Sequence, residues 1–568
     1  MTRPGRGWTR SASPPEPIWV TDDMGVSVSA RIYRPACPPR GAVVICGPWG
    51  YDATRLQRTR RVLAHGLAAC DLLVLDLDHP DTGSSSLDHG RPDALDTWRR
   101  ALPAGIAWMH AAGVPQPTIV GIGLGALLAA DAARDAERVG PLVLWTPARS
   151  GSEVARRLRA MSLVTPHSGA DIDPHTINVF GHRLHRQVLT GLKQWDPWRS
   201  LSPACDVSVV DDAQRPEPDI IAGLLHSVRI SARVLQVSGL RPLLDEDAED
   251  GVVPMEAVRV VVREVASRAR WAATVIPPTF AESRRLGDDQ ASGVEEFLRL
   301  GPLGPVGVLT SPPKPSDRPA AVLFVNNGVN DASGPARLWV TWSRRLVNDG
   351  VMSLRLDLRG LGNSPLPARG RIDRPTALPH ESGADVDRAV AQLRAAGARL
   401  VILVGLCSGA YIGMANAAYS AAPVDHVVGL NPPLYYPRNV GSGPWNPLTW
   451  PSLGWVMHKR RLREAAHRLP RGLHLAADAA YVYPAPDRML WRASRRVRCD
   501  VVLAAADRET LDLRARGRFG FAEPGHHGLV SISHVEGLDH SLFDPAHHES
   551  VFAMVRAAAL GSPGDSSR

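Results

Sequence analysis

Residues 400–418 read LVILVGLCSGAYIGMANAA, and this stretch decides the fold. It opens with a short run of Val, Ile and Leu, which is typical of a buried β-strand. It closes with the Ala-rich run AYIGMANAA, which favours a helix. Between the two runs Gly405 and Gly409 flank Cys407, and glycine allows backbone segments to approach closely in a sharp turn. The stretch therefore predicts a strand, a tight turn and a helix, with Cys407 at the turn.

The layout around this stretch occurs twice in the chain. The first half contains, in order, RGAVVICGPWGYD, DLLVLDLDHPDTGSSS, TIVGIGLGALLAADAA and GPLVLWTP. The second half contains AAVLFVNNGVNDA, GVMSLRLDLRGLGNSP, the stretch above and DHVVGLNPP, and Asp76 and Asp357 hold matching places. Short apolar runs that alternate with helical stretches favour a parallel sheet built from βαβ units. We therefore expect two tandem α/β domains, each a mostly parallel sheet flanked by helices.

Further elements can be predicted around the two repeats. Apolar residues at helical spacing predict helices over residues 93–110 and 384–396. Each half is expected to open with an antiparallel hairpin, in PIWVTDDMGVSVSARIYRP and in EEFLRLGPLGPVGVLTSPP. After its fourth apolar run each half carries a long segment rich in Arg, Trp and Pro, at residues 150–227 and 433–495. We expect these two insertions to form lids over an active site.

The two repeats divide the chain into two domains. A polar, Gly-containing segment, SRRLGDDQASG, lies between them and is typical of an inter-domain linker. We predict a flexible N-terminus, a first domain, a linker, a second domain and a flexible tail, over residues 1–16, 17–285, 286–296, 297–560 and 561–568 respectively.

The composition argues against several classes of protein. The net charge is +8, yet no basic run is interleaved with aromatic residues, so we expect no nucleic acid partner. No run of about 18 apolar residues exists, so no membrane span is predicted, and the basic, Pro-rich N-terminus lacks the apolar core of a secretory signal. The six cysteines form no CxxC pair, so neither a metal nor another cofactor is indicated. We expect a cytoplasmic protein, in which a free thiol stays reduced.

The turn at Cys407 matches the nucleophile elbow G-x-S-x-G, with cysteine in place of serine. A thiolate is a strong nucleophile, and the N-terminus of the following helix stabilises negative charge. The alternative is that Cys407 is a small core residue, because free cysteines are often buried for packing. Ser408 lies one place beyond the nucleophile position, and its backbone N–H is expected in an oxyanion hole.

An elbow nucleophile needs an acid and then a base further along the chain. CDVVLAAAD ends in Asp507, and GLVSISHVEGLDHSLFDP contains His540 in the loop after a late strand. We predict that these two residues complete a triad with Cys407. His534 is the main rival for the base and Glu509 for the acid, whereas Asp539 adjoins the base and should point elsewhere.

A second oxyanion donor is expected in the loop after the first strand of the second sheet. This loop reads VLFVNNGVND, so the backbone amides near Asn327 and Gly328 are the candidates. The alternative is that Asn-Gly is only a common turn.

The first half lacks the corresponding groups. By the repeat, Cys407 matches Gly123 in GIGLG, and no histidine follows the late run ARVLQVSGLRPLLDEDAED. Cys46 and His79 lie near the predicted elbow but do not stand in triad order. We therefore expect the first half to be a degenerate domain that packs on the second, shapes its entrance or binds a partner.

On these motifs the chain resembles the exosortase-associated α/β-hydrolases, within the wider group of serine-aminopeptidase-like hydrolases. The second half is similar to the type-1 associated hydrolase in VLFVNNG, SLRLDLRGLGNS, GLCSGA, GLNPP and GLDHSLF. The first half is similar to the type-2 relative in ICGPWGYD, GIGLGALLA and LVLWTPARSG. The resemblance implies two α/β-hydrolase folds and acyl or ester chemistry near polysaccharide or secondary-metabolite biosynthesis. The joining of both types in one chain departs from the usual separate proteins.

These observations predict an acyltransferase or thioesterase-like enzyme that acts on a small-molecule ester or thioester through Cys407, His540 and Asp507. An acyl-carrier protein is a candidate partner for delivery of the substrate. Two alternatives stay open. One is a simple hydrolase of small esters or lactones, and the other is a non-catalytic scaffold of two degenerate hydrolase folds.

Overall fold

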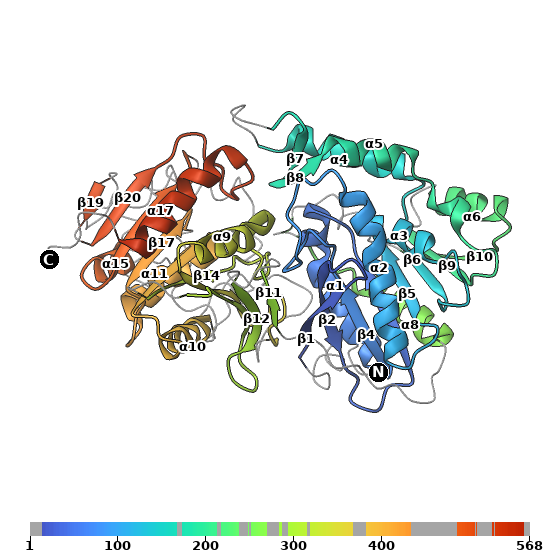
Figure 1. Cartoon of the computed structure of the whole chain (residues 1–568), viewed down its shortest axis with the longest axis horizontal. Helices are drawn as coiled ribbons and strands as arrows, with labels where there is room; N and C mark the ends of the chain where they lie inside the picture. The colour runs from blue at the N-terminus through green and yellow to red at the C-terminus, as the bar shows by residue number, and fades with distance from the viewer. Residues whose placement is uncertain are drawn as a thin grey trace, which may run out of the picture.

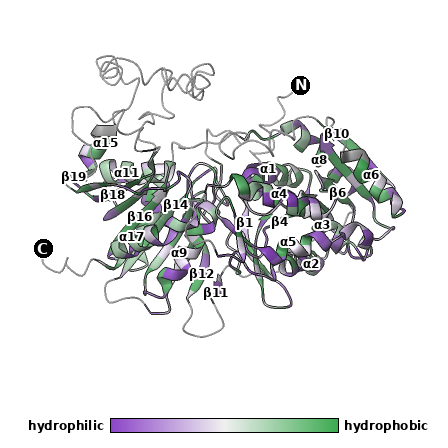
Figure 2. Ribbon diagram, turned by 90° about the horizontal axis from the view of Figure 1, so that it is seen from above, coloured by the Kyte–Doolittle hydropathy of each residue, from purple (hydrophilic) through white to green (hydrophobic). Residues whose placement is uncertain are grey.

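The computed structural model describes residues 14–561, apart from residues 167–172, 213–216, 238–247, 249–250, 270–282, 287–292, 315–318, 367–381, 433–485, 506, 508–524 and 528. The chain forms two α/β halves that lie side by side, the first blue to green and the second yellow to red in Figure 1. In Figure 2 the central strands of both halves are mainly hydrophobic, as expected for sheets that are covered on both faces.

The first half is built on an eight-stranded sheet with the order β1-β2-β4-β3-β5-β6-β9-β10. Only β2 runs antiparallel to its two neighbours, and all further pairs are parallel. The strands are β1 (Glu16–Thr21), β2 (Ser27–Tyr33), β3 (Gly41–Cys46), β4 (Leu72–Leu77), β5 (Thr118–Ile122), β6 (Leu142–Trp145), β9 (Val207–Asp212) and β10 (Ala232–Val237).

The second half repeats this order within a ten-stranded sheet, β11-β12-β13-β15-β14-β16-β17-β18-β20-β19. Without the edge strands β11 and β19, its strands match those of the first sheet one for one. The strands are β11 (Ser283–Arg285), β12 (Val294–Arg299), β13 (Val306–Ser311), β14 (Ala320–Val325), β15 (Met352–Asp357), β16 (Leu400–Leu406), β17 (His426–Leu430), β18 (Arg498–Leu503), β19 (Gly525–His527) and β20 (Val530–His534). This strand order is that of an α/β-hydrolase, so both predicted domains have the expected fold.

Helices cover both faces of each sheet. In the first half α1 (Tyr51–Ala68) and α8 (Met255–Arg268) share one core, and α2 (Ala94–Ala111) and α3 (Leu124–Ala132) share the other. In the second half α9 (Leu338–Val347) and α17 (His548–Leu560) cover one face, whereas α10 (Ser382–Ala395), α11 (Ser408–Tyr419) and α15 (Pro486–Ala493) cover the other. The helices predicted over residues 93–110 and 384–396 are confirmed as α2 and α10, and both opening hairpins are present.

The insertion of the first half is shorter than predicted. It contains α4 (Gly151–Val164), the hairpin β7 (Thr176–Val179) and β8 (His182–His185), α5 (Arg186–Gln194) and the short helix η1 (Pro197–Ser200). The predicted range 150–227 was wrong at its end, because β9 enters the sheet and α6 (Glu217–Ser227) follows it. The sequence VSVVDD of β9 ends in two acidic residues, so it does not stand out as a buried apolar strand.

The insertion of the second half also ends earlier than predicted. Residues 433–485 lie outside the described residues, and α15 then packs Leu490 and Ala493 into the core beside α11. The second sheet begins with β11, which ends at Arg285 just before the predicted linker, and β12 begins at Val294, so the last residues of the predicted linker belong to a strand. β12 adds to the edge of β13, and β11 in turn adds to the edge of β12, because each edge strand offers unpaired backbone groups.

The two halves meet through polar and charged groups. Arg337 donates to the Gly83 carbonyl at 2.9 Å, and Arg344 donates to the Ser85 carbonyl at 2.8 Å. Arg31 pairs with Asp331 at 3.3 Å. Such partners are needed because a buried charge is costly unless it is paired. The contact therefore joins the halves in one defined arrangement.

No helix in the described part of the chain is long and apolar enough to cross a membrane.

Candidate active site

The predicted elbow lies between β16 and α11. Cys407 has φ 53° and ψ −122°, a backbone conformation that is strained for a residue other than glycine. Its N–H donates to the Leu430 carbonyl at 2.9 Å, and its carbonyl accepts from Tyr411 N–H at 3.1 Å. Strand β17 and the first turn of α11 thus hold the strained residue from two sides.

The two glycines of the motif permit this turn. A Cβ on Gly405 would lie 2.4 Å from the Gly409 carbonyl carbon, and a Cβ on Gly409 would lie 2.6 Å from the Val325 carbonyl oxygen. Both distances are far below van der Waals contact, so only glycine fits at either place. The close packing brings α11 down onto β14 and leaves Cys407 half-buried at the tip, whereas Cys499 is fully buried.

The structure brings His540 and Asp507 together. Asp507 follows β18, and His540 lies in the loop after β20, as expected from the sequence. The Nδ1 atom of His540 is 2.9 Å from both carboxylate oxygens of Asp507. This contact fixes the orientation of the ring and leaves Nε2 for another partner.

That other partner is the Cys407 thiol. Burial opposes a charge on His540, but hydrogen bonds to Asp507 and to Cys407 outweigh it and raise the pKa of His540 from 6.5 to about 11. The imidazole ring of His540 therefore lies between the Asp507 carboxylate and the Cys407 sulfur. The three predicted triad residues therefore lie in one contiguous chain of contacts.

One residue that the sequence did not single out, Asn431, supports this chain. Asn431 follows β17 with φ 46° and donates through Nδ2 to the His540 carbonyl at 2.9 Å. Its Oδ1 accepts from Ala504 N–H at 2.7 Å. Asn431 thus connects the loops that carry the acid and the base. The signal for it was its place directly after the fourth strand of the repeat.

Asp539 has a different task from its neighbour His540. Its two carboxylate oxygens accept from the backbone N–H groups of Ser541, Phe543 and Asp544 at 2.9 to 3.0 Å. The carboxylate therefore points along its own loop and closes it, as expected.

The rival residues do not join the triad within the described chain. His534 ends β20, and its buried Nε2 has no hydrogen-bond partner among the described residues. Glu509, the alternative acid, lies outside the described residues. Ser408 is only 1% exposed, so its side chain is closed to a substrate while its backbone begins α11.

The predicted oxyanion loop follows β14. The side chain of Asn327 accepts through Oδ1 from the N–H groups of Val329 at 3.1 Å and Asn330 at 2.9 Å. These bonds hold the loop closed, and the role of the Asn327, Gly328 and Ser408 amides as oxyanion donors stays a prediction. Asn327 lines the cavity described below, so the loop lies beside His540.

The first half keeps the elbow without its chemistry. Gly123 has φ 60° and ψ −117°, close to the values of Cys407, and its N–H donates to the Trp145 carbonyl at 3.0 Å. A Cβ on Gly125 would meet the Cys46 carbonyl, as Gly409 meets Val325. This match places Pro48 where the second half has Asn327, and proline has no N–H to donate.

Cys46 and His79 are core groups. Burial raises the pKa of Cys46 to about 12 and lowers the pKa of His79 to about 4. His79 Nε2 lies 2.9 Å from the Gly47 carbonyl. Both groups are therefore neutral near pH 7.

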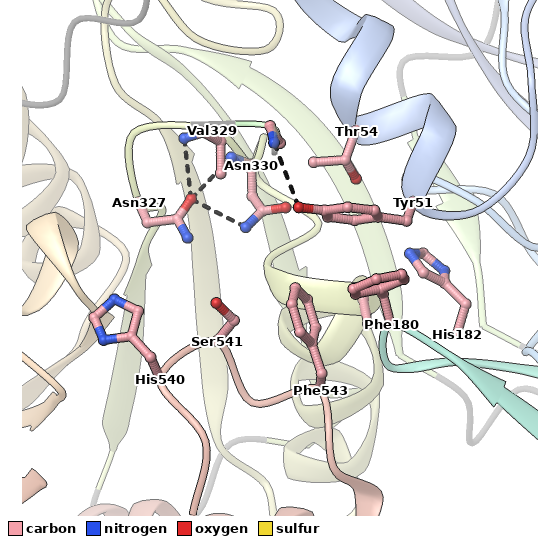
Figure 3. Close-up of a pocket in the computed structure, with 12 residues that line it drawn as sticks. Tyr51, Thr54, Phe180, His182, Asn327, Val329, Asn330, His540, Ser541 and Phe543 are labelled. Atoms are coloured by element: carbon pink, nitrogen blue, oxygen red, sulfur yellow. Dashed lines mark hydrogen bonds between the residues drawn. The ribbon is translucent and has the colours of Figure 1, made fainter. Parts of the chain in front are cut away.

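A cavity of about 230 Å³ lies beside His540. Figure 3 shows His540 and Ser541 on one side and Tyr51, Phe180 and His182 on the other, with Phe543 between them. The lining residues come from both halves: Tyr51, Thr54, Phe180, His182, Ala248, Asn327, Val329, Asn330, Ala336, His540, Ser541 and Phe543. Among the described residues no group of three or more His, Cys, Asp or Glu side chains could hold a metal ion.

No family model and no curated protein matches the chain. Among solved structures, DcsB in complex with its substrate analogue is 15% identical, covers 45% of this chain and 100% of its own, and gives a TM-score of 0.34. Est1E from Butyrivibrio proteoclasticus is 14% identical over 45% of this chain and 97% of its own, with a TM-score of 0.32. The esterase domain of a Rhodothermus marinus protein is 14% identical over 45% and 99%, with a TM-score of 0.32. The fold assignment rests on the strand order described above.

Proposed function

We propose that the second half is a cysteine acyl-transfer enzyme with Cys407 as nucleophile, His540 as acid and base, and Asp507 as the residue that orients His540. The observation that carries the proposal is the contact chain from Asp507 through His540 to the Cys407 thiol. A reactive thiol needs a base within reach and a third group that holds the base. The strained elbow supports the same role, because such backbone persists mainly at functional sites.

In the proposed reaction, His540 holds the proton of the Cys407 thiol. The thiolate attacks the carbonyl carbon of an ester or thioester, and the amides of Ser408 and of the Asn327–Gly328 turn stabilise the oxyanion. His540 then gives its proton to the leaving alkoxide or thiolate, and an acyl-thioester remains on Cys407. A second nucleophile loses its proton to His540 and attacks the acyl-thioester, and the C–S bond breaks, which restores the Cys407 thiolate and the protonated His540.

The molecule that accepts the acyl group from Cys407 distinguishes an acyltransferase from a hydrolase. A thioester intermediate is comparatively receptive to amines and thiols, which favours transfer over hydrolysis. The finer resemblance to exosortase-associated hydrolases and the delivery of substrate by an acyl-carrier protein remain predictions. Product analysis with and without an added amine separates transferase from hydrolase, and equal product ratios in both conditions would exclude transfer to that amine.

The cysteines of the chain supply internal controls for a labelling test. Cys37 is exposed, Cys407 is half-buried and Cys499 is buried, so accessibility alone ranks Cys37 first. We expect brief exposure to iodoacetamide at pH 6 to label Cys407 faster than Cys37, as measured by intact mass and peptide mapping. The His540→Ala variant should lose this advantage. Labelling in the order of exposure at every pH would favour the non-catalytic scaffold.

A further inference from the structure

The hairpin β7–β8 brings an aromatic residue of the first half to the site of the second. Val179 pairs with His182 in the hairpin register, so Phe180 and Gly181 form a two-residue turn. Their φ values are 49° and 83°, as in a type I′ turn, where Asn and Gly are preferred. A bulky side chain is disfavoured at positive φ. The presence of Phe180 at this place therefore points to a task for its ring.

The tip of this hairpin is fixed against the second half. Asn178 donates through Nδ2 to the Phe543 carbonyl at 2.7 Å, and its Oδ1 accepts from Gly181 N–H at 2.8 Å. A Cβ on Gly181 would lie 2.5 Å from the Cβ of Ala336, so only glycine allows this approach. The hairpin thus contacts the loop that carries His540. The contact is at Phe543, three residues after His540.

Three aromatic rings form one wall of the cavity. Tyr51 and Phe180 are stacked with centroids 4.4 Å apart, and Phe543 meets them edge-on at 5.6 Å and 5.4 Å. Figure 3 shows these rings opposite Asn327 and His540. Aromatic walls of this kind favour flat apolar groups, which stack on ring faces or meet ring edges.

Within the described part of the chain, His540 is the one charged residue that lines the cavity. Its lining contains no Asp, Glu, Lys or Arg among the described residues. Burial and the charge of Arg337 lower the pKa of His182 to about 4, so that ring is neutral near pH 7. An acyl group with its own carboxylate would therefore find no cation there beyond the catalytic one. The volume lies below the range of roughly 300–1,000 Å³ that is usual for drug-sized ligands.

We infer that the first half forms the recognition wall of the acyl site, with Tyr51 and Phe180 as specificity-determining residues for a compact, uncharged acyl group that ends in a flat apolar ring. This inference rests on the proposed function, because it requires Cys407 to react in the cavity. It also explains how a domain with Gly123 at its elbow serves the enzyme. The long insertion of the first half exists, on this view, to deliver Phe180.

The test uses the full chain and four probes that share one chloroacetamide group, with N-phenyl, N-methyl, N-octyl or N-carboxymethyl substituents. Peptide mapping gives the alkylation rate of Cys407 for each probe. We expect the N-phenyl probe to react fastest in the wild type. The Phe180→Asn variant keeps a residue that suits the turn while it removes the ring, and it should reduce the N-phenyl preference over N-methyl by about 10-fold or more.

Two further variants complete the design. Tyr51→Ala should reduce the same preference, whereas Tyr419→Ala, an exposed aromatic change on α11 outside the cavity lining, should leave it unchanged. Rapid but unselective labelling of Cys407, an unchanged preference in Phe180→Asn, or a preference for the octyl or carboxymethyl probe would overturn the inference and leave the proposed function standing. Labelling of Cys407 no faster than Cys37 by every probe would overturn both.

Discussion

The elbows of the two halves share a backbone and differ in their side chains. Gly123 and Cys407 have nearly equal φ and ψ angles, and the residues that follow the next strand, Thr146 and Asn431, have φ 45° and 46°. The close glycine contacts behind each elbow are also repeated. The shape of the turn is therefore a packing feature of the fold, which persists whether or not the site carries catalytic groups.

The difference between the halves is concentrated at three places. The first half has Gly123 for Cys407, Pro48 for Asn327, and no histidine after β10. Each change removes one group that the proposed acyl chemistry requires: the nucleophile, a backbone donor or the base. A glycine at positive φ also removes the strain that a cysteine must bear there. The first half is relaxed where the second is strained, which is expected if only the second is catalytic.

The largest expected effect comes from replacing Cys407 by glycine, the residue that the first half has at the matching position. Cys407→Gly should abolish acyl chemistry, a loss of about 10⁶-fold for removal of a triad nucleophile. The free energy of unfolding should not decrease, because glycine avoids the cost of about 1 kcal/mol that another residue has at positive φ. Ester turnover and thermal unfolding measure the two effects. Retained turnover would show that Cys407 is not the nucleophile.

The second prediction concerns the orienting acid and pH. Asp507→Asn should reduce turnover by about 10⁴-fold, as in other triads. In the wild type the pKa of His540 is raised to about 11, so the protonated ring should keep Cys407 labelling nearly constant from pH 6 to 9.

Because folding favours the protonated ring, its contribution to stability is complete below about pH 6.5 and is lost as the pH rises toward 11.

The rate of iodoacetamide labelling of Cys407, measured as a function of pH, checks the labelling prediction in the wild type and in Asp507→Asn. In Asp507→Asn the labelling rate of Cys407 should be lower than in the wild type near neutral pH. It should increase with pH, as the rate of an ordinary thiol does. A wild-type rate that climbs tenfold per pH unit from pH 6 upward would contradict the ion pair between His540 and Cys407.

The third prediction concerns Asn431, the residue that follows β17. Asn431→Thr installs the residue of the first half and removes the hydrogen bonds to His540 and Ala504. Loss of a buried hydrogen-bond partner costs about 1–3 kcal/mol, and misplacement of the base should lower turnover by about 10²-fold. Urea unfolding and turnover report the two losses, with Thr146→Asn as the reciprocal control. Unchanged turnover would show that Asn431 is only a packing residue.

The smallest expected effect is the reverse elbow exchange. Gly123→Cys places a thiol on the degenerate elbow at a cost of about 1–2 kcal/mol for a left-handed residue. Because no histidine stands behind it, this thiol should label no faster than Cys37. Labelling at the rate of Cys407 would mean that the elbow alone activates a thiol.

The sequence predicted the fold well because its strands are buried on both faces and read as unbroken apolar runs. The strand β9 and the ends of the insertions were missed, since VSVVDD ends in two acidic residues and lacks the apolar character of a buried strand. The contact of Asp507, His540 and Cys407 was predictable from chain order and loop position. Asn431 was not predicted, because its role depends on three loops that meet only in the folded chain.

The sequence by itself determined the repeated α/β layout, the elbow with Cys407 and the absence of matching groups in the first half, because these follow from local patterns and residue identities. The tertiary structure alone decided that Tyr51 and Phe180 lie beside His540. These residues are hundreds of positions away from the base, and no spacing in the sequence links them to it. They reach the site only because charged contacts between the halves, such as that of Arg31 with Asp331, hold both domains in one arrangement.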